Sequence, residues 1–226
     1  MTHRCLLYYI SDRSQFRGGA CDQRRELLAK IVEATRAGVD YIQLREKDLS
    51  ARELTTLAGD ALSAMRNTIP QRTENRERKT RLLLNSRTDL ALAAGADGVH
   101  LRADDLSPNE VRKVLDVSAQ RALAIGHFLV AVSCHSNEDV IRAESEAADF
   151  AVFAAVFGKQ NAPVAQATGI ARLREACQAK IPVLALGGVT LQNADTCLKA
   201  GAAGIAAIRL FQENRIEEVV RALRSL

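Results

Sequence analysis

The sequence of 226 residues contains no tryptophan, and aromatic residues make up only 4% of it. So few rings leave no evident platform on which nucleic-acid bases would stack. Long hydrophobic runs are also missing, since no apolar stretch approaches the roughly 18 residues that cross a bilayer. The segment Met1–Arg4 lacks the apolar core and the cleavage site of a signal peptide. We therefore expect a cytoplasmic protein that binds neither nucleic acid nor a membrane.

The sequence also lacks paired cysteine motifs, and its net charge is small. It has five cysteines, an odd number, and no CxxC pair. This pattern fits neither a disulfide framework nor a zinc site, and a reducing compartment accounts for it. The 31 basic and 27 acidic residues give a net charge of +4, and five of the basic residues lie in Gln71–Arg81. A stretch of this kind is typical of a solvated loop.

The sequence does contain eight apolar runs of strand length, which alternate with segments of helical period. The runs are Leu6–Ser11, Tyr41–Arg45, Arg81–Asn85, Gly98–Leu101, Leu129–Cys134, Phe150–Phe157, Val183–Gly187 and Ile205–Arg209. The helical segments include Gln23–Arg36, Ala51–Met65, Asn109–Val114, Asn137–Ala147, Ala171–Gln178, Leu191–Ala200 and Ile216–Leu226. Eight such units predict an α/β protein with a closed (β/α)₈ TIM barrel.

An internal repeat supports this interpretation. Ala37–Leu44 resembles Ala94–Leu101, and weaker copies occupy Glu146–Phe153 and Ala200–Ala207. Each copy begins with the end of a helix and leads into a buried strand, and the spacing leaves room for two βα units between copies. A doubly wound open sheet is the alternative fold, but Ser11–Gly19 lacks its glycine fingerprint. We expect one TIM-barrel domain over residues 1–226.

Polar residues cluster where the predicted strands end, which is where such barrels place their chemistry. Gln43, Arg45 and Lys47 alternate along one strand, so all three point into the barrel mouth, where the two cations suit a polyanion. Gly187 and Gly188 after the seventh strand suit either a phosphate cup or a tight turn. These residues favour small phosphorylated substrates.

Other residues at the strand ends have two interpretations each. His135 is either a general base or a capping and packing residue, and His100 points inward as a core histidine would. Asp104 and Asp105 either hold Mg²⁺ or complement the dipole of the next helix. Cys134 alternates away from the mouth, so we expect it to be buried and unreactive.

These strand ends resemble the thiamine phosphate synthase family and its close relative, the thiazole tautomerase. The resemblance covers nearly the whole chain. Its most specific motifs are Tyr41–Asp48, Asn85–Ala91, Ala94–Leu101, Ser133–Ser136 and Leu186–Thr190. It implies a transferase of thiamine biosynthesis that joins hydroxymethylpyrimidine diphosphate to a thiazole phosphate and releases diphosphate with Mg²⁺. Diphosphate would leave a pyrimidine carbocation, which the thiazole nitrogen captures. Relatives are often homo-oligomers.

The resemblance also implies a role for each matching residue. The groups that would hold the pyrimidine diphosphate are Gln43, Arg45, Lys47, Asn85 and Lys159, with Ser133 beside them. His100 would line the pyrimidine pocket, and Asp105 would bind Mg²⁺. Gly188 with Ile208 and Arg209 would bind the thiazole phosphate.

The sequence departs from the family pattern at several of these positions. Ser86 stands where the family usually has an aspartate that binds Mg²⁺, which predicts weakened metal binding. Arg209 replaces a serine that the family usually has after the eighth strand. Its charge would strengthen phosphate binding, whereas its bulk would block the phosphate pocket, and both alternatives stay open.

These losses keep two other functions open. One is a metal-independent thiazole tautomerase, an isomerase in which His135 is the base. The other is a non-catalytic barrel that binds a phosphate ligand, because a fold does not dictate an activity.

Overall fold

The computed structural model describes residues 4–68, 80–117, 127–158 and 169–226, and they form a closed barrel. Each strand pairs in parallel with the next, and the eighth pairs with the first. The strands are β1 (Leu6–Ile10), β2 (Tyr41–Leu44), β3 (Arg81–Asn85), β4 (Gly98–Leu101), β5 (Leu129–Cys134), β6 (Phe150–Phe153), β7 (Val183–Ala185) and β8 (Gly204–Ala207). The predicted (β/α)₈ barrel is therefore confirmed.

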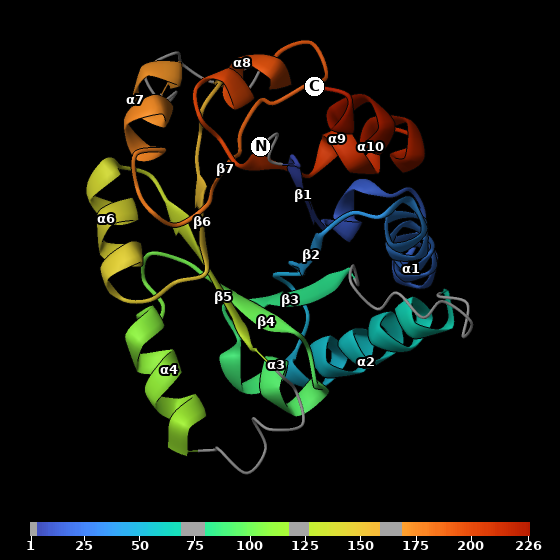
Figure 1. Ribbon diagram of the computed structural model, residues 1–226. Helices are drawn as coiled ribbons and strands as arrows, with labels where there is room; N and C mark the ends of the chain where they lie inside the picture. The colour runs from blue at the N-terminus through green and yellow to red at the C-terminus, as the bar shows by residue number, and fades with distance from the viewer. Residues whose placement is uncertain (1–3, 69–79, 118–126, 159–168) are drawn as a thin grey trace, which may run out of the picture.

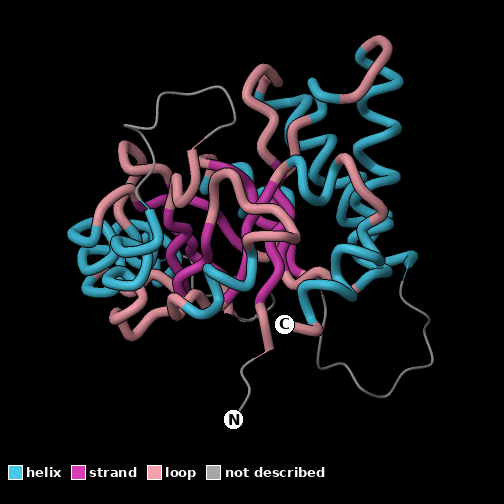
Figure 2. The backbone as a smooth tube through the Cα atoms, turned by 90° about the horizontal axis from the view of Figure 1, so that it is seen from above, coloured by secondary structure: helices cyan, strands magenta, loops and turns pink. Residues whose placement is uncertain are grey.

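Helices surround the ring of strands on its outside (Figure 1), and the side view shows them flanking the central strands (Figure 2). They are η1 (Arg13–Gln15), α1 (Ala20–Ala37), α2 (Ala51–Thr68), α3 (Thr88–Ala94), α4 (Pro108–Val117), α6 (Asn137–Ser145), α7 (Gly169–Ala176), α8 (Ala194–Lys199), α9 (Arg209–Gln212) and α10 (Ile216–Arg224). Within the described ranges, no helix has the length and apolar character needed to cross a membrane.

The sequence repeat has a structural cause at the N-terminal ends of the strands. In three of its four copies the fourth residue is an aspartate whose carboxylate accepts a hydrogen bond from a backbone N–H of the preceding strand. The three bonds run from Leu7 to Asp40 (2.8 Å), from Leu82 to Asp97 (2.9 Å) and from Val130 to Asp149 (2.6 Å). In the fourth copy, Ala203 has no carboxylate, and its backbone N–H donates to the carbonyl of Val183 at 2.8 Å.

The next residue of each copy is either a large aromatic residue or a glycine, and it lies at the N-terminal end of the barrel interior. Tyr41 and Phe150 occupy this position on β2 and β6, and their rings stack across the interior with centroids 4.8 Å apart. Gly98 and Gly204 occupy it on β4 and β8, where a Cβ atom would come within 2.3 Å of the Leu129 oxygen and 2.0 Å of the Leu6 oxygen. Alternate strands thus supply one interior layer made of two rings and two glycines.

Helix ends follow the same repeat. Gly38 (φ 79°) and Gly95 (φ 69°) end α1 and α3 in the left-handed conformation, which glycine adopts without steric cost. After α6, Ala147 takes up the same conformation with φ 62°. At the start of α2, Ser50 and Glu53 form a capping box, with the Glu53 carboxylate 2.9 Å from the Ser50 nitrogen.

Several predicted boundaries are wrong. The apolar run Phe150–Phe157 is strand only to Phe153, and Val183–Gly187 only to Ala185, because β6 and β7 stop pairing there. The run predicted as Ile205–Arg209 is strand at Gly204–Ala207, and Arg209 instead begins α9. The helix α3 was not predicted. Most of the basic stretch Gln71–Arg81 lies outside the described residues.

Candidate active site

The predicted site residues of β2 and β3 meet at the C-terminal rim of the barrel. Gln43 is buried at 2% exposure, and its Nε2 donates to Oδ1 of Asn85, the last residue of β3, at 2.9 Å. The Asn85 Nδ2 in turn donates to the Ser86 Oγ at 2.9 Å. The two amides therefore orient one another, because each amide has one acceptor and one donor end.

Arg45 and Lys47 extend the rim beyond the end of β2. Arg45 is half-buried and Lys47 is exposed. The backbone N–H of Arg45 donates to the Oγ of Ser11, the residue that follows β1, at 3.0 Å. The bond from β1 fixes where the Arg45 side chain starts, and Arg45 lies near enough to His100 for its charge to act on that imidazole.

A buried ionic network beneath Arg45 was not predicted. Glu46, 6% exposed, accepts from the Ser11 hydroxyl at 2.5 Å and from the Arg13 Nη1 at 3.0 Å. Arg13 also clamps Asp48 with both terminal nitrogens at 2.7 Å. These bonds tie the loop after β1 to the end of β2.

Burial and hydrogen bonding oppose each other at Glu46. Burial raises the pKa of its carboxyl above the ordinary value, while the Ser11 hydroxyl and the Arg13 groups lower it. A second tie holds the same loop from the other side, where Gln212 of α9 accepts from the Tyr9 hydroxyl at 3.1 Å and donates to the Asp12 carbonyl at 2.7 Å.

His100 and Ser133 form the second pair of predicted residues that the structure brings together. The His100 Nε2 lies 2.8 Å from the Ser133 Oγ, and its Nδ1 lies 3.1 Å from the hydroxyl of Tyr8, a fully buried residue of β1. Burial, with a smaller contribution from the charge of Arg45, lowers the pKa of His100 to about 3. The imidazole is thus neutral, and both of its nitrogens have a partner, as a core histidine requires.

His135 lies apart from this pair. It is exposed, and its Nδ1 is 2.9 Å from the carbonyl oxygen of Ala154 beyond β6. Its backbone N–H donates to Asp139, whose carboxylate also belongs to the capping box of Ser136 at the start of α6. Among the described residues no hydrogen bond joins the His135 ring to Ser133 or His100. Its neighbour Cys134 is buried, and burial raises the pKa of its thiol to about 12, which makes it a poor nucleophile.

Gly187 and Gly188 follow β7 with φ values of 100° and 66°. A Cβ atom at Gly187 would lie 2.7 Å from that of Ala155, and one at Gly188 would lie 2.8 Å from that of Phe157. Backbone bonds from Phe157 to Gly187 and from Val156 to Leu186, both 2.9 Å, hold the two loops together. Both glycines are therefore required by the turn and by the contact with the loop after β6.

The remaining predicted ligands differ in how far the structure describes them. Ile208 precedes α9 and is half-buried, and Arg209 is exposed at its first position. Lys159 lies outside the described residues.

The predicted metal site has one carboxylate. Asp105, with a side chain 14% exposed, accepts from the Arg102 backbone N–H at 2.7 Å, and its other oxygen lies 3.7 Å from the Arg102 Nε. Ser86 has a positive φ of 64° and donates its backbone N–H to the carbonyl of His100. In the part of the chain that the structure describes, no three His, Cys, Asp or Glu residues cluster as a metal site would require. A single protein carboxylate is compatible with Mg²⁺ only where other oxygens, such as those of phosphate groups and water, supply the remaining ligands.

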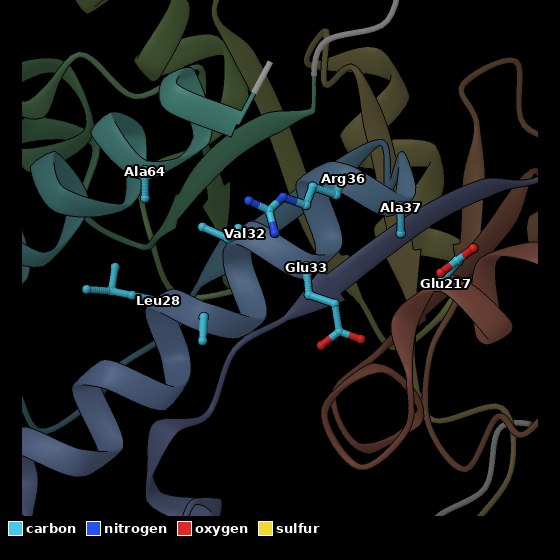
Figure 3. Close-up of a pocket in the computed structure, with 8 residues that line it drawn as sticks. Leu28, Val32, Glu33, Arg36, Ala37, Ala64 and Glu217 are labelled. Atoms are coloured by element: carbon cyan, nitrogen blue, oxygen red, sulfur yellow. The ribbon is translucent and has the colours of Figure 1, made fainter. Parts of the chain in front are cut away.

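One further hollow lies on the outer helical layer. It has a volume of about 700 Å³ and runs between α1, α2 and α10 (Figure 3). Its lining residues are Leu28, Ala29, Val32, Glu33, Arg36, Ala37, Ala64 and Glu217. None of the rim residues described above lines it, so it is separate from the candidate active site.

Comparison with known proteins places the chain in a family. The sequence profile described as "Thiamine monophosphate synthase" matches residues 7–211. The thiamine-phosphate synthase of Syntrophomonas wolfei is 34% identical, covering 97% of this chain and 95% of that protein. That of Caldanaerobacter subterraneus is also 34% identical, covering 93% and 88%. A solved structure, thiamine phosphate pyrophosphorylase from Pyrococcus furiosus, matches with a TM-score of 0.75 and 25% identity over 99% of this chain and 95% of that one. The chain belongs to the thiamine monophosphate synthase family.

Proposed function

We propose that this protein is a thiamine-phosphate synthase, which couples hydroxymethylpyrimidine diphosphate to a thiazole phosphate and releases diphosphate. The observation that carries this proposal is the rim of the barrel, where the Gln43–Asn85 amide pair lies on the strands next to Arg45 and Lys47. Family membership and relatives with this name over nearly their whole length support it.

The proposed binding site uses these groups for the diphosphate. Arg45 supplies a planar fork for phosphate oxygens and Lys47 a point charge. Gln43 and Asn85 add neutral hydrogen-bond donors and acceptors, whose orientation their mutual bond restricts. Together with Lys159, these groups would bind the diphosphate ester, which carries up to three negative charges, and would stabilise the additional charge that the diphosphate gains as the C–O bond breaks.

Mg²⁺ belongs to this proposal through Asp105 and Ser86. When bound, the ion neutralises charge on the departing diphosphate. Asp105 would hold it through a carboxylate oxygen and Ser86 only through a neutral hydroxyl. Oxygens of the diphosphate would have to supply the other ligands, so we expect the protein alone to bind the ion weakly.

The thiazole phosphate would bind on the opposite part of the rim. Gly187 and Gly188 have no side chain of their own that would cover their backbone amides, and Ile208 and Arg209 follow the adjacent strand β8. Arg209 adds a positive charge where the family usually has a neutral serine, which favours a phosphate at this place.

The experiment is an assay of the purified protein with both substrates and Mg²⁺, with thiamine phosphate and diphosphate measured as products. Arg45→Ala and Gln43→Ala should each lower kcat/KM for the pyrimidine substrate by about 100-fold, the size of effect expected of a charge-stabilising donor. Arg221→Ala, an exposed cation in the last turn of the outer helix α10, is the matched control. Absence of thiamine phosphate at every Mg²⁺ concentration would refute the proposal.

The same preparation separates the alternatives. A tautomerase would isomerise the thiazole phosphate without metal and lose this activity in His135→Ala. A binding barrel would bind a phosphate ligand in calorimetry and turn over neither substrate. The comparisons favour neither alternative. The exposed His135 ring, bonded to Ala154, is the group that a tautomerase would use as its base.

A further inference from the structure

Tyr8, His100 and Ser133 form a chain of hydrogen bonds that leads from the sealed interior of the barrel to its mouth. Tyr8 on β1 is 0% exposed and His100 on β4 is 2% exposed, whereas Ser133 near the end of β5 is half-buried. The two links measure 3.1 Å and 2.8 Å. The proposed mechanism gives no role to Tyr8, and the direction in which the three protons point has consequences for Ser133.

The Tyr8 hydroxyl fixes that direction. The Tyr8 ring packs edge-on against the stacked rings of Tyr41 and Phe150, with centroid distances of 5.9 and 5.6 Å. Complete burial raises its pKa well above the ordinary value, so the phenol keeps its proton. Within the described ranges, the His100 Nδ1 is the one hydrogen-bond partner of this hydroxyl. A buried O–H without an acceptor is destabilising, and the proton therefore points at Nδ1.

The neutral imidazole transmits this direction. It carries one proton, and an Nδ1 that accepts from Tyr8 leaves that proton on Nε2. The Nε2–H then donates to the Ser133 Oγ. In the opposite tautomer Ser133 would donate to Nε2 and Nδ1 would donate to Tyr8, which would strand the phenolic proton in the core.

We infer that Tyr8, acting through His100, makes Ser133 a dedicated hydrogen-bond donor to the anionic substrate in the barrel mouth. The Ser133 oxygen already accepts from Nε2, so its own proton is directed away from His100 and toward the rim that carries Gln43 and Arg45. Tyr8 is thus a positioning residue. The identity of the acceptor, an oxygen of the diphosphate, rests on the proposed function, but the direction of the chain does not.

The direction is tested on the free protein by ¹⁵N NMR of ring-labelled histidine, with the His100 signals identified by their loss in His100→Gln. At neutral pH we expect a protonated Nε2 and an unprotonated Nδ1. Ser133→Ala should keep this tautomer, because Tyr8 and not Ser133 sets it. Tyr8→Phe should convert His100 to a mixture. A wild-type His100 protonated at Nδ1, or a tautomer that changes in Ser133→Ala, would overturn the inference, whatever the activity of the enzyme.

The consequence for turnover is tested by kinetics. Tyr8→Phe should lower kcat about tenfold or more, with KM changed less than about twofold, since the lost donor acts on charge that develops in the transition state. In the Ser133→Ala background the same substitution should cost nothing further. The control is Tyr41→Phe, which removes a hydroxyl from the same aromatic cluster at the other end of the barrel, near Asp40 and Arg81. Equal losses in both variants, or additive losses in the double variant, would reject the role of Tyr8.

Discussion

Glu46 and Arg13 form an ion pair that is almost fully buried. Their side chains are 2% and 10% exposed and 3.0 Å apart. The Glu46 charge is compensated by Arg13 and by the Ser11 hydroxyl, and Arg13 is compensated by Asp48 as well. Ser11 links Glu46 to the rim, because its hydroxyl donates to the Glu46 carboxylate and accepts from the backbone N–H of Arg45. A buried ion pair here serves to fix the position of a cation that stays partly solvated.

Ser86 occupies a position at which the proposed Mg²⁺ site can be tested. We predict that Ser86→Asp lowers the Mg²⁺ concentration for half-maximal activity by at least about tenfold, because it adds a unit charge within a few ångströms of the ion. Aspartate tolerates the positive φ of 64° at this position better than most residues. A metal titration of the steady-state rate measures the effect.

Ser86→Asn is the control for this substitution. It has the size and the backbone preference of aspartate without the charge, and it should leave the metal dependence near that of the wild type. An equal shift in both variants would show that charge at position 86 is not the cause.

His100 makes the stability of the fold depend on pH. Its pKa is about 3 in the folded state against an ordinary 6.5, so below pH 6.5 the unfolded chain takes up a proton that the folded chain does not. The contribution of His100 to the free energy of unfolding should therefore be fully present above pH 6.5. Below that pH it should fall by up to about 1.4 kcal/mol per pH unit as the pH drops toward 3. Urea unfolding at pH 7, 6 and 5 measures this slope.

The matched variant is His100→Gln, which cannot titrate. Its unfolding free energy should be lower at pH 7, but its slope between pH 6.5 and 5 should be smaller than that of the wild type by close to one proton. Parallel slopes would mean that other groups cause the acid sensitivity.

Among the helices and strands, the sequence predicted the bounds of a strand correctly where its apolar run ends at the same residue as its hydrogen-bonded pairing. Three strands, Arg81–Asn85, Gly98–Leu101 and Leu129–Cys134, have the predicted bounds. Phe150–Phe157 was predicted too long because apolar residues continue after pairing stops, and the pattern records burial rather than hydrogen bonding.

The sequence predicted the residues of the rim but not the groups that hold them in place. Residues of the rim follow from strand alternation, and the structure brings Gln43 to Asn85 and His100 to Ser133. The network of Arg13 with Glu46 was missed because its members are 33 positions apart and no local pattern predicts that a charge is buried. Tyr8 was missed since a tyrosine in an apolar strand resembles any core residue until its hydroxyl has a partner.

The end of α6 carries strain that the ends of α1 and α3 avoid. Ala147 is exposed and has a φ of 62°, a conformation that is unfavourable for a residue with a Cβ atom. We predict that Ala147→Gly stabilises the protein by about 1 kcal/mol and raises Tm by about 2–4 °C for a chain of this length. Calorimetry measures the change.

Ala29→Gly is the comparison for this prediction. Ala29 is exposed in the middle of α1, where glycine should cost about 1 kcal/mol. If both substitutions destabilise the protein, the left-handed backbone at residue 147 is not the source of the strain.

For the whole molecule, the two ends of the barrel have different tasks. The aspartates of the repeat and the layer of Tyr41 and Phe150 stabilise the N-terminal end, while the polar rim lies at the C-terminal end. Asp97→Ala should therefore destabilise the fold by about 1–3 kcal/mol, since it leaves the Leu82 N–H without its acceptor, and kcat should not change.

Asp97→Asn retains an oxygen that can accept the same bond and should recover most of this stability. Denaturant unfolding and steady-state kinetics on both variants test the separation. A loss of kcat at a temperature where Asp97→Ala is fully folded would show that the two ends are coupled.

The close contact of Gly187 and Gly188 with Ala155 and Phe157 has a consequence for how this barrel can diversify. The loops after β6 and β7 share one interface with no room for a Cβ atom, so neither is an independent module. A chimera that takes the β7 loop from a relative should fold well only if the β6 loop comes from the same donor. The unit of inheritance on this side of the mouth is thus a pair of loops, and substitutions in one should be accompanied by changes in the other.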